Sequence, residues 1–253
     1  MGRNIGQKVQ KMQENYVNYA FYFVLTCTRA LCTLWLMKSS FDLSVYVIID
    51  PAVCNGRSVG DVAAAAMRGG ATMVQLRNKT DSIALVKEQA LIIQKVLADS
   101  SVTFIMNDHV ELAAEINVDG VHIGQGDMSA AQAREIVGKD KILGLTAFTR
   151  AHYDVVDSSI IDYVGTGPFY ATLTKPDKAV LGAEGFAVLA KDSPVPVVGI
   201  GGITSDNAAA VIKAGADGVA MMRAVTAADN IEHALRDFVT AVKGARHEHS
   251  QCA

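Results

Sequence analysis

The chain has 253 residues and a formal charge of −3, and half of its residues are hydrophobic. This composition is typical of a folded globular protein and excludes a disordered or collagen-like chain. The slight acidic excess argues against a nucleic-acid partner, because duplex binding normally requires a strong basic excess. The cysteines at 27, 32, 54 and 252 show no C-x-x-C spacing, so we expect neither a disulfide framework nor a structural zinc, and a cytoplasmic location.

Residues 1–42 form an N-terminal extension that differs from the rest of the chain. Residues 19–37 are mostly apolar and about as long as a membrane span, which needs ~20 such residues. The central Arg29 argues against insertion, since an arginine there costs roughly 2.5–3.5 kcal/mol. Three interpretations stay open: a targeting or membrane anchor, an additional helix, and an over-long start with Met37 as the initiator.

From residue 43 onward, short β-branched runs alternate with alanine-rich helical stretches, as in parallel strands linked by amphipathic helices. The expected strands are residues 45–50, 72–76, 102–106, 119–123, 141–145, 161–165, 195–200 and 217–221. The expected helices are residues 59–68, 82–97, 110–115, 129–136, 151–157, 184–190, 205–213 and 231–242.

Eight strand–helix units predict an α/β fold, a (β/α)8 TIM barrel over residues 43–244 with a tail at 245–253. A doubly wound sheet is the rival fold. It is disfavoured because Asp50 and Pro51 follow the first strand, where that fold expects a G-x-G-x-x-G turn.

Active groups of such barrels lie at the carboxyl ends of the strands, so the residues after each strand are the candidates. Gln75, Arg77 and Lys79 are spaced by two after the second strand, and their side chains would point the same way. Two cations and an amide suit a phosphate or pyrophosphate. The alternative is a solvated surface pair.

Carboxylates follow the next two strands. Asn107 and Asp108 come after the third strand and Asp127 after the fourth. Two carboxylates on neighbouring strand ends beside cations are a common way to hold Mg²⁺. Singly, Asp108 could cap the following helix and Asp127 could be a turn residue. Together they favour a metal.

The last strands predict a second phosphate site. The longest strand-to-helix loop runs from 165 to 182, and long loops in compact barrels commonly bind ligands. The loops after strands seven and eight are the usual phosphate-binding corner, here before a helix expected to open at Ser205. The candidate ligands of this phosphate are Thr172, Thr174, Lys175, Gly201, Gly202 and Arg223.

Two anion sites and Mg²⁺, without a nucleophile–base pair, indicate transfer of a group away from pyrophosphate. His122, on the fourth strand, is either a hydrogen-bonded core histidine or a substrate contact.

With these residues assembled, the sequence closely resembles the thiamine phosphate synthase (thiamine-phosphate pyrophosphorylase) family. The matching segments occur in family order between residues 44 and 244: VQLRNK (74–79), NDHVELA (107–113), DGVHIGQGD (119–127), DYVGTGPFYATLTK (162–175) and VPVVGIGGI (195–203). The resemblance implies a Mg²⁺-dependent transferase of thiamine biosynthesis. It would join hydroxymethylpyrimidine pyrophosphate to thiazole phosphate, with release of pyrophosphate through a pyrimidine carbocation.

The resemblance also implies roles for individual residues. Arg77, Lys79 and Asn107 would hold the pyrophosphate, Asp108 and Asp127 the Mg²⁺, and Lys175 the leaving charge. Gln75 would face the pyrimidine, with His122 and Thr146 among the substrate contacts. Thr172, Thr174, Gly201 and Gly202 would bind the thiazole phosphate. Catalysis would rest chiefly on Arg77, Thr146 and Lys175.

Two positions depart from the family pattern. A serine usually stands where Thr146 is, which keeps the hydroxyl. Arg223 replaces a usual serine after the last strand, and it could either bind the thiazole phosphate or crowd it.

Three alternatives remain. One is a thiazole tautomerase or phosphosugar isomerase, although tautomerases are expected to carry a histidine after strand five, where residues 146–149 read TAFT. The others are a non-catalytic binder of thiamine intermediates and a membrane-tethered form of any of these. The small-molecule substrates are the expected partners, and a homo-oligomer is possible.

Overall fold

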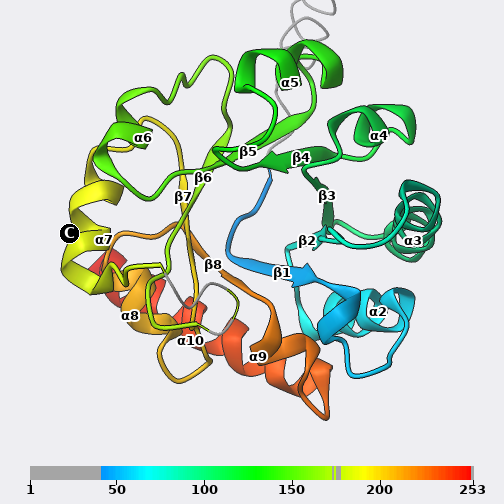
Figure 1. The fold of residues 1–253 in the computed structure, drawn as a ribbon. Helices are drawn as coiled ribbons and strands as arrows, with labels where there is room; N and C mark the ends of the chain where they lie inside the picture. The colour runs from blue at the N-terminus through cyan, green and yellow to red at the C-terminus, as the bar shows by residue number, and fades with distance from the viewer. Residues whose placement is uncertain (1–40, 173, 175–177, 252–253) are drawn as a thin grey trace, which may run out of the picture. The chain divides into compact units, whose positions relative to one another are not determined.

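A computed structural model of the chain describes residues 41–172, 174 and 178–251 (Figure 1). Eight parallel strands pair in sequence order, and the last pairs with the first, so the sheet closes into a barrel. This confirms the predicted (β/α)8 fold. The strands are β1 (Val45–Ile49), β2 (Met73–Leu76), β3 (Thr103–Asn107), β4 (Gly120–Ile123), β5 (Ile142–Thr146), β6 (Tyr163–Thr166), β7 (Val197–Ile200) and β8 (Gly218–Met221).

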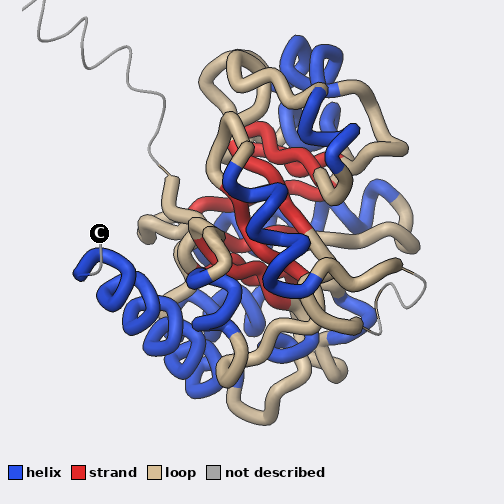
Figure 2. Tube along the Cα trace, turned by 90° about the vertical axis from the view of Figure 1, so that its left-hand side faces the viewer, coloured by secondary structure: helices blue, strands red, loops and turns tan. Residues whose placement is uncertain are grey.

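Helices follow the strands and surround the barrel (Figures 1 and 2). Several begin at a serine whose hydroxyl accepts a hydrogen bond from the backbone N–H three residues later, as at Ser58, Ser82 and Ser129. The helices are η1 (Pro51–Val53), α2 (Val59–Gly69), α3 (Ile83–Leu97), α4 (Val110–Glu115), α5 (Ala130–Val137), α6 (Arg150–Asp154), α7 (Gly182–Lys191), α8 (Ala208–Lys213), α9 (Arg223–Thr226) and α10 (Ile231–Gln251).

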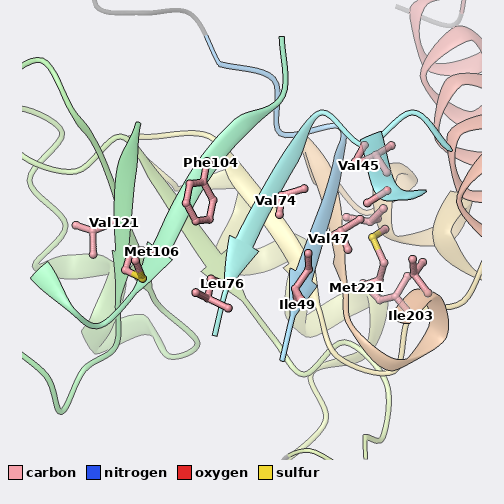
Figure 3. Packing of buried hydrophobic residues seen from close by; sticks show 14 of the residues in the cluster. Val45, Val47, Ile49, Val74, Leu76, Phe104, Met106, Val121, Ile203 and Met221 are labelled. Atoms are coloured by element: carbon pink, nitrogen blue, oxygen red, sulfur yellow. The ribbon is translucent and has the colours of Figure 1, made fainter. Parts of the chain in front are cut away.

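The alternation of side chains along each strand divides the core in two. On β1, Val45, Val47 and Ile49 belong to the large cluster that includes the surrounding helices, and Figure 3 shows them beside side chains of β2 and β3. Tyr46 and Ile48 belong to a smaller cluster formed chiefly by the other face of the strands. The period of two therefore places every second residue inside the barrel.

The helices in the last part of the barrel include departures from the prediction. The helix after β7 begins at Ala208 instead of Ser205, because Asn207 accepts a hydrogen bond from the Thr204 N–H and donates one to the Gly202 carbonyl. These bonds hold residues 204–207 in turns. The four-residue α9 was not predicted, since it is too short to show a helical period. The final helix extends nine residues beyond Val242, to Gln251.

Phe41 marks the start of the described structure. Its ring packs against Tyr163, with the centroids 5.9 Å apart, at the entry to β1. The N-terminal extension up to residue 40, including residues 19–37, lies outside the described residues. Of the helices that the structure describes, none has the length and apolar character that crossing a bilayer requires.

Candidate active site

A cavity of about 510 Å³ opens at the carboxyl ends of the strands. It is lined by residues from all eight strands or the loops that follow them. Lys175 lies outside the described residues. Every other site residue predicted from the sequence lines this cavity: Gln75, Arg77, Lys79, Asn107, Asp108, His122, Asp127, Thr146, Thr172, Thr174, Gly201, Gly202 and Arg223.

The cations after β2 are each paired with a carboxylate. Arg77 forms an ion pair with Asp50, and Lys79 lies 2.6 Å from Asp108. Sequence reasoning did not assign a role to Asp50. The pairing follows from the order of the strands. β1 and β2 are neighbours, and the Arg77 N–H donates a hydrogen bond to the Ile49 carbonyl, so Asp50 lies beside Arg77.

The backbone at Asp108 directs its carboxyl group into the cavity. Asp108 has a φ of 60°, a left-handed conformation that aspartate tolerates better than most residues. The cap of α4 is His109, which makes no side-chain capping bond, so the alternative interpretation of Asp108 as a helix cap was wrong. Asn107 donates a hydrogen bond to the Asp108 carboxylate. The uncommon left-handed backbone of Asp108 thus helps to place its carboxyl group at the site.

Asp108 and Asp127 face each other across the ends of β3 and β4. Burial raises the pKa of Asp108, and the nearby Asp127 carboxylate adds to this, while Lys79 opposes it. Burial also acts on Asp127, but the Gly124 N–H and the hydrogen bond with Asp108 outweigh it and lower the pKa of Asp127. Gly124 donates that bond over 2.7 Å, so Asp127 holds a turn as well as facing its neighbour.

This pair has the donor chemistry of a magnesium site. Mg²⁺ prefers oxygen ligands and commonly takes one or two carboxylates, with water and phosphate oxygens completing its shell. Within the described part of the chain, no group of three or more His, Cys, Asp or Glu side chains is placed to hold a metal. Asp108 and Asp127 therefore fit a cation that is shared with a phosphate substrate.

The opposite wall of the cavity is built by close approach of two loops. Gly201 and Gly202 have φ values of 99° and 66°. A Cβ on Gly201 would lie 2.7 Å from the Pro168 Cα, and one on Gly202 would lie 2.4 Å from the Ala171 carbonyl oxygen. Only glycine allows this conformation and this approach together.

Three polar side chains complete that wall. Thr172 and Thr174 belong to the loop between β6 and α7, and the Thr172 hydroxyl accepts a hydrogen bond from the Thr174 N–H. Arg223 is the first residue of α9 and is one of the residues that line the cavity. No hydrogen bond or ion pair joins its guanidinium to another residue in the described ranges. These groups are available to an anion.

Two tyrosines inside the barrel were missed by sequence reasoning. Tyr46 and Tyr163 are fully or almost fully buried, and their hydroxyl oxygens lie 2.9 Å apart. Gln75 donates to Tyr46, and Tyr163 contacts His122. Inward-facing aromatic residues on strands look like ordinary core residues in a sequence, so nothing marked these two as polar partners of the site.

The rim of the cavity holds one further contact. The Lys178 Nζ atom lies 3.9 Å from the centre of the Phe148 ring, a cation–π geometry. Both residues line the cavity. They join the loop after β5 to the loop after β6.

The family model for thiamine monophosphate synthase matches residues 45–225. A thiamine-phosphate synthase of Xanthobacter autotrophicus is 41% identical over 211 residues, covering 83% of this chain and 100% of the relative. One of Chloroflexus aurantiacus is 42% identical over 200 residues, covering 78% and 91%.

A solved structure supports the same grouping. The thiamine phosphate pyrophosphorylase of Pyrococcus furiosus is 30% identical with a TM-score of 0.73, and the match covers 80% of this chain and 96% of that one. The family match spans more than half of the chain, and its relatives are matched over nearly their full length. The chain belongs to the thiamine monophosphate synthase family.

Proposed function

We propose that this chain is a thiamine-phosphate synthase, a transferase that joins hydroxymethylpyrimidine pyrophosphate to thiazole phosphate and releases pyrophosphate. The observation that carries the proposal is one cavity with two anion-binding walls. Arg77 and Lys79 lie on one wall beside paired carboxylates, and the Gly201–Gly202 turn lies on the other. Two phosphorylated substrates would meet between them.

The pyrophosphate would lie against the ends of β2, β3 and β4. Arg77 keeps several N–H donors beyond those facing Asp50, and the Asn107 side chain lies at the same edge. Asp108 and Asp127 would hold Mg²⁺, which when bound would supply positive charge against the charge that develops on the leaving pyrophosphate. Lys175 is proposed to contribute a further positive charge from the loop after β6. Such catalysis consists mainly of positioning and electrostatic stabilisation.

The pyrimidine would lie deeper, over the interior of the barrel. Gln75 is 3% exposed and lines the cavity floor, where its amide would bind the ring. His122 and Thr146 line the same region from β4 and β5. A mostly apolar interior excludes water, and this protects a carbocation from hydrolysis.

The thiazole phosphate would bind in the corner formed by the loops after β6, β7 and β8. Thr172, Thr174 and the backbone of Gly201 and Gly202 supply donors there. We assign Arg223 to the same phosphate, because this residue lines the cavity and its guanidinium has no hydrogen bond or ion pair with the residues described. A guanidinium binds phosphate with two parallel hydrogen bonds.

The proposal is tested by an assay of the purified protein with both substrates. Thiamine phosphate and pyrophosphate are quantified together, with Mg²⁺ and with a chelator. We expect equal amounts of the two products, and their loss on chelation. Product formation that is unaffected by the chelator would contradict the metal assignment. Conversion of a thiazole phosphate alone, without pyrophosphate, would support a tautomerase instead.

A further inference from the structure

A continuous set of hydrogen bonds crosses the inside of the barrel from β2 to β5. The Tyr46 and Tyr163 hydroxyl oxygens lie 2.9 Å apart, and the Tyr163 oxygen lies 3.0 Å from His122 Nδ1. His122 Nε2 lies 3.0 Å from the Thr146 Oγ1 atom, and Gln75 donates to Tyr46 at the other end. We call these five side chains the interior network, in the order Gln75, Tyr46, Tyr163, His122 and Thr146.

Four of the five members of the interior network line the cavity, and one does not. Gln75, Tyr46, His122 and Thr146 are lining residues, whereas the Tyr163 side chain is wholly buried. Burial raises the pKa of Tyr163 far above its ordinary value, and the neighbouring Tyr46 adds to this shift. Both tyrosines therefore keep their hydroxyl hydrogens.

The network has two continuous arrangements of its hydrogen atoms, one the reverse of the other. A phenol carries one hydrogen and a neutral imidazole carries one N–H, so in a continuous arrangement each member that accepts on one side donates on the other. In the arrangement that begins with Gln75 donating its Nε2 hydrogen to Tyr46, Tyr46 donates to Tyr163 and Tyr163 donates to His122 Nδ1. His122 then carries its hydrogen on Nε2 and donates it to Thr146.

Glycines of β5 and β6 make room for this arrangement. A Cβ atom on Gly144 would lie 2.2 Å from the Tyr163 Cζ and 2.5 Å from the His122 Nδ1. One on Gly165 would lie 3.1 Å from the His122 Cε1. A glycine inside a strand commonly marks such a close approach. The contact between Tyr163 and His122 is therefore fixed by packing as well as by hydrogen bonding.

We propose that the interior network gives the site a fixed hydrogen-bond polarity, which means that Gln75 Oε1 is always an acceptor and the Thr146 hydroxyl is always a donor toward the substrate. Tyr163 and His122 act as positioning residues. The inference rests on the proposed function, whose pyrimidine substrate carries an amino group and a pyrophosphate. The amino group donates to Gln75, and a pyrophosphate oxygen accepts from Thr146. In the reversed direction Thr146 would donate its one hydrogen to His122 and present only lone pairs to the anion, so the direction with Thr146 as donor matches this substrate better.

The position of the hydrogen on His122 tests the direction without any turnover. Nitrogen NMR of protein labelled at histidine, assigned with a His122→Gln variant, distinguishes a protonated from an unprotonated Nδ1. We expect an unprotonated Nδ1 in the wild type. In Gln75→Glu the carboxylate only accepts, so the direction should reverse and Nδ1 should become protonated. A protonated Nδ1 in the wild type, or an unprotonated one in Gln75→Glu, would overturn the proposal.

Turnover of a second variant tests the consequence for catalysis. Tyr163→Phe breaks the link between Tyr46 and His122, so we expect a mixture of His122 tautomers and a kcat lower by roughly tenfold, the effect of one hydrogen bond. The KM for thiazole phosphate should not change. The matched control is Tyr153→Phe, which removes another buried hydroxyl that lies 2.6 Å from Thr166 Oγ1.

The control should leave both the His122 tautomer and kcat at their wild-type values. Equal effects of the two substitutions would show a structural role alone and overturn the proposal, as would wild-type kcat in Tyr163→Phe. Because the tautomer is measured without substrate, an inactive wild-type protein with the expected tautomers would count against the proposed function and not against the polarity of the network.

Discussion

The Nζ atom of Lys79 lies 2.6 Å from Oδ2 of Asp108, so a proposed pyrophosphate ligand is ion-paired with a proposed metal ligand. The pair is half exposed on the lysine side, with 48% of that side chain accessible. Solvent screening weakens such a partly exposed pair, so under the proposed function Mg²⁺ and pyrophosphate would replace it.

The first prediction concerns this ion pair. Lys79→Met should tighten binding of Mn²⁺, as a probe for Mg²⁺, by about two- to fivefold in the absence of substrate, since exposed pairs contribute about 0.2–1 kcal/mol. The measurement is a titration in which free Mn²⁺ is followed by electron paramagnetic resonance. Lys87→Met is the control, because Lys87 pairs with Glu115 outside the cavity. Weaker Mn²⁺ binding in Lys79→Met would contradict this account.

The second prediction concerns Asp108 itself. Asp108→Asn should lower turnover by at least about a hundredfold, because a neutral amide can neither hold a cation in this way nor compensate Lys79. The thermal midpoint should stay within a few degrees of wild type, since the carboxyl group is raised in pKa by burial and its loss removes an unfavourable charge. Pyrophosphate release and thermal unfolding are measured on the same sample. Activity above a tenth of wild type would exclude Asp108 as a metal ligand.

The third prediction distinguishes the two possible effects of Arg223. If the guanidinium binds the thiazole phosphate as proposed, Arg223→Ser raises the KM for that substrate by roughly tenfold and leaves the KM for the pyrimidine substrate unchanged. Arg223→Lys should give an intermediate KM, because it keeps the charge but loses the planar fork. A lower KM in Arg223→Ser would mean that the side chain crowds the site.

The fourth prediction contrasts two glycines. Gly144→Ala should destabilise the fold by about 1–3 kcal/mol or more, since its methyl group would overlap the Tyr163 ring. Gly244 lies in α10, and no atom is within 4 Å of a methyl group added there. Gly244→Ala should therefore stabilise the fold by about 0.5–1 kcal/mol. Urea unfolding of both variants gives the sign directly, and the same sign for both would contradict the packing described.

The fifth prediction concerns the thiol of Cys54. Burial raises its pKa to about 11, with a smaller contribution from Asp50 and an opposing one from Arg57. At pH 8 the folded protein therefore holds this thiol almost entirely protonated, and iodoacetamide should not label it, because the thiolate is the reactive form. Because Cys54 is also fully buried, labelling should stay slow until the fold opens. Peptide-resolved mass spectrometry, with urea-unfolded protein as the positive control, makes the measurement; rapid labelling of the native protein at pH 8 would refute it.

Much of the barrel could be predicted because each strand is a short apolar run and the longer helices have an amphipathic period, several with a serine cap. The strand ends could be assigned to a site because parallel strands place their carboxyl ends together. Asp108 and Gln75 were predictable for this reason. The bounds of α8 were not, because the bonds of Asn207 depend on the Gly202 carbonyl, which only the folded loop brings near.

The hydrogen-bond and ion-pair partners of the site residues were harder to predict than the site residues themselves. The pairing of Arg77 with Asp50 requires knowing that β1 and β2 are neighbours with a given register. The contact of Tyr163 with His122 joins residues 41 positions apart and depends on which face of two strands points inward. Such contacts arise from closure of the barrel and leave no local pattern in the sequence.

Because Gly144 has no side chain, it leaves the space in which the Tyr163 and His122 side chains meet inside the barrel. Any larger residue at this position would occupy the space where Tyr163 reaches His122. Redesign of the barrel interior for another substrate would therefore begin most effectively here. Filling this position and shortening Tyr163 together would uncouple β4 from β6, and would open a compartment whose hydrogen-bond donors and acceptors could be chosen anew.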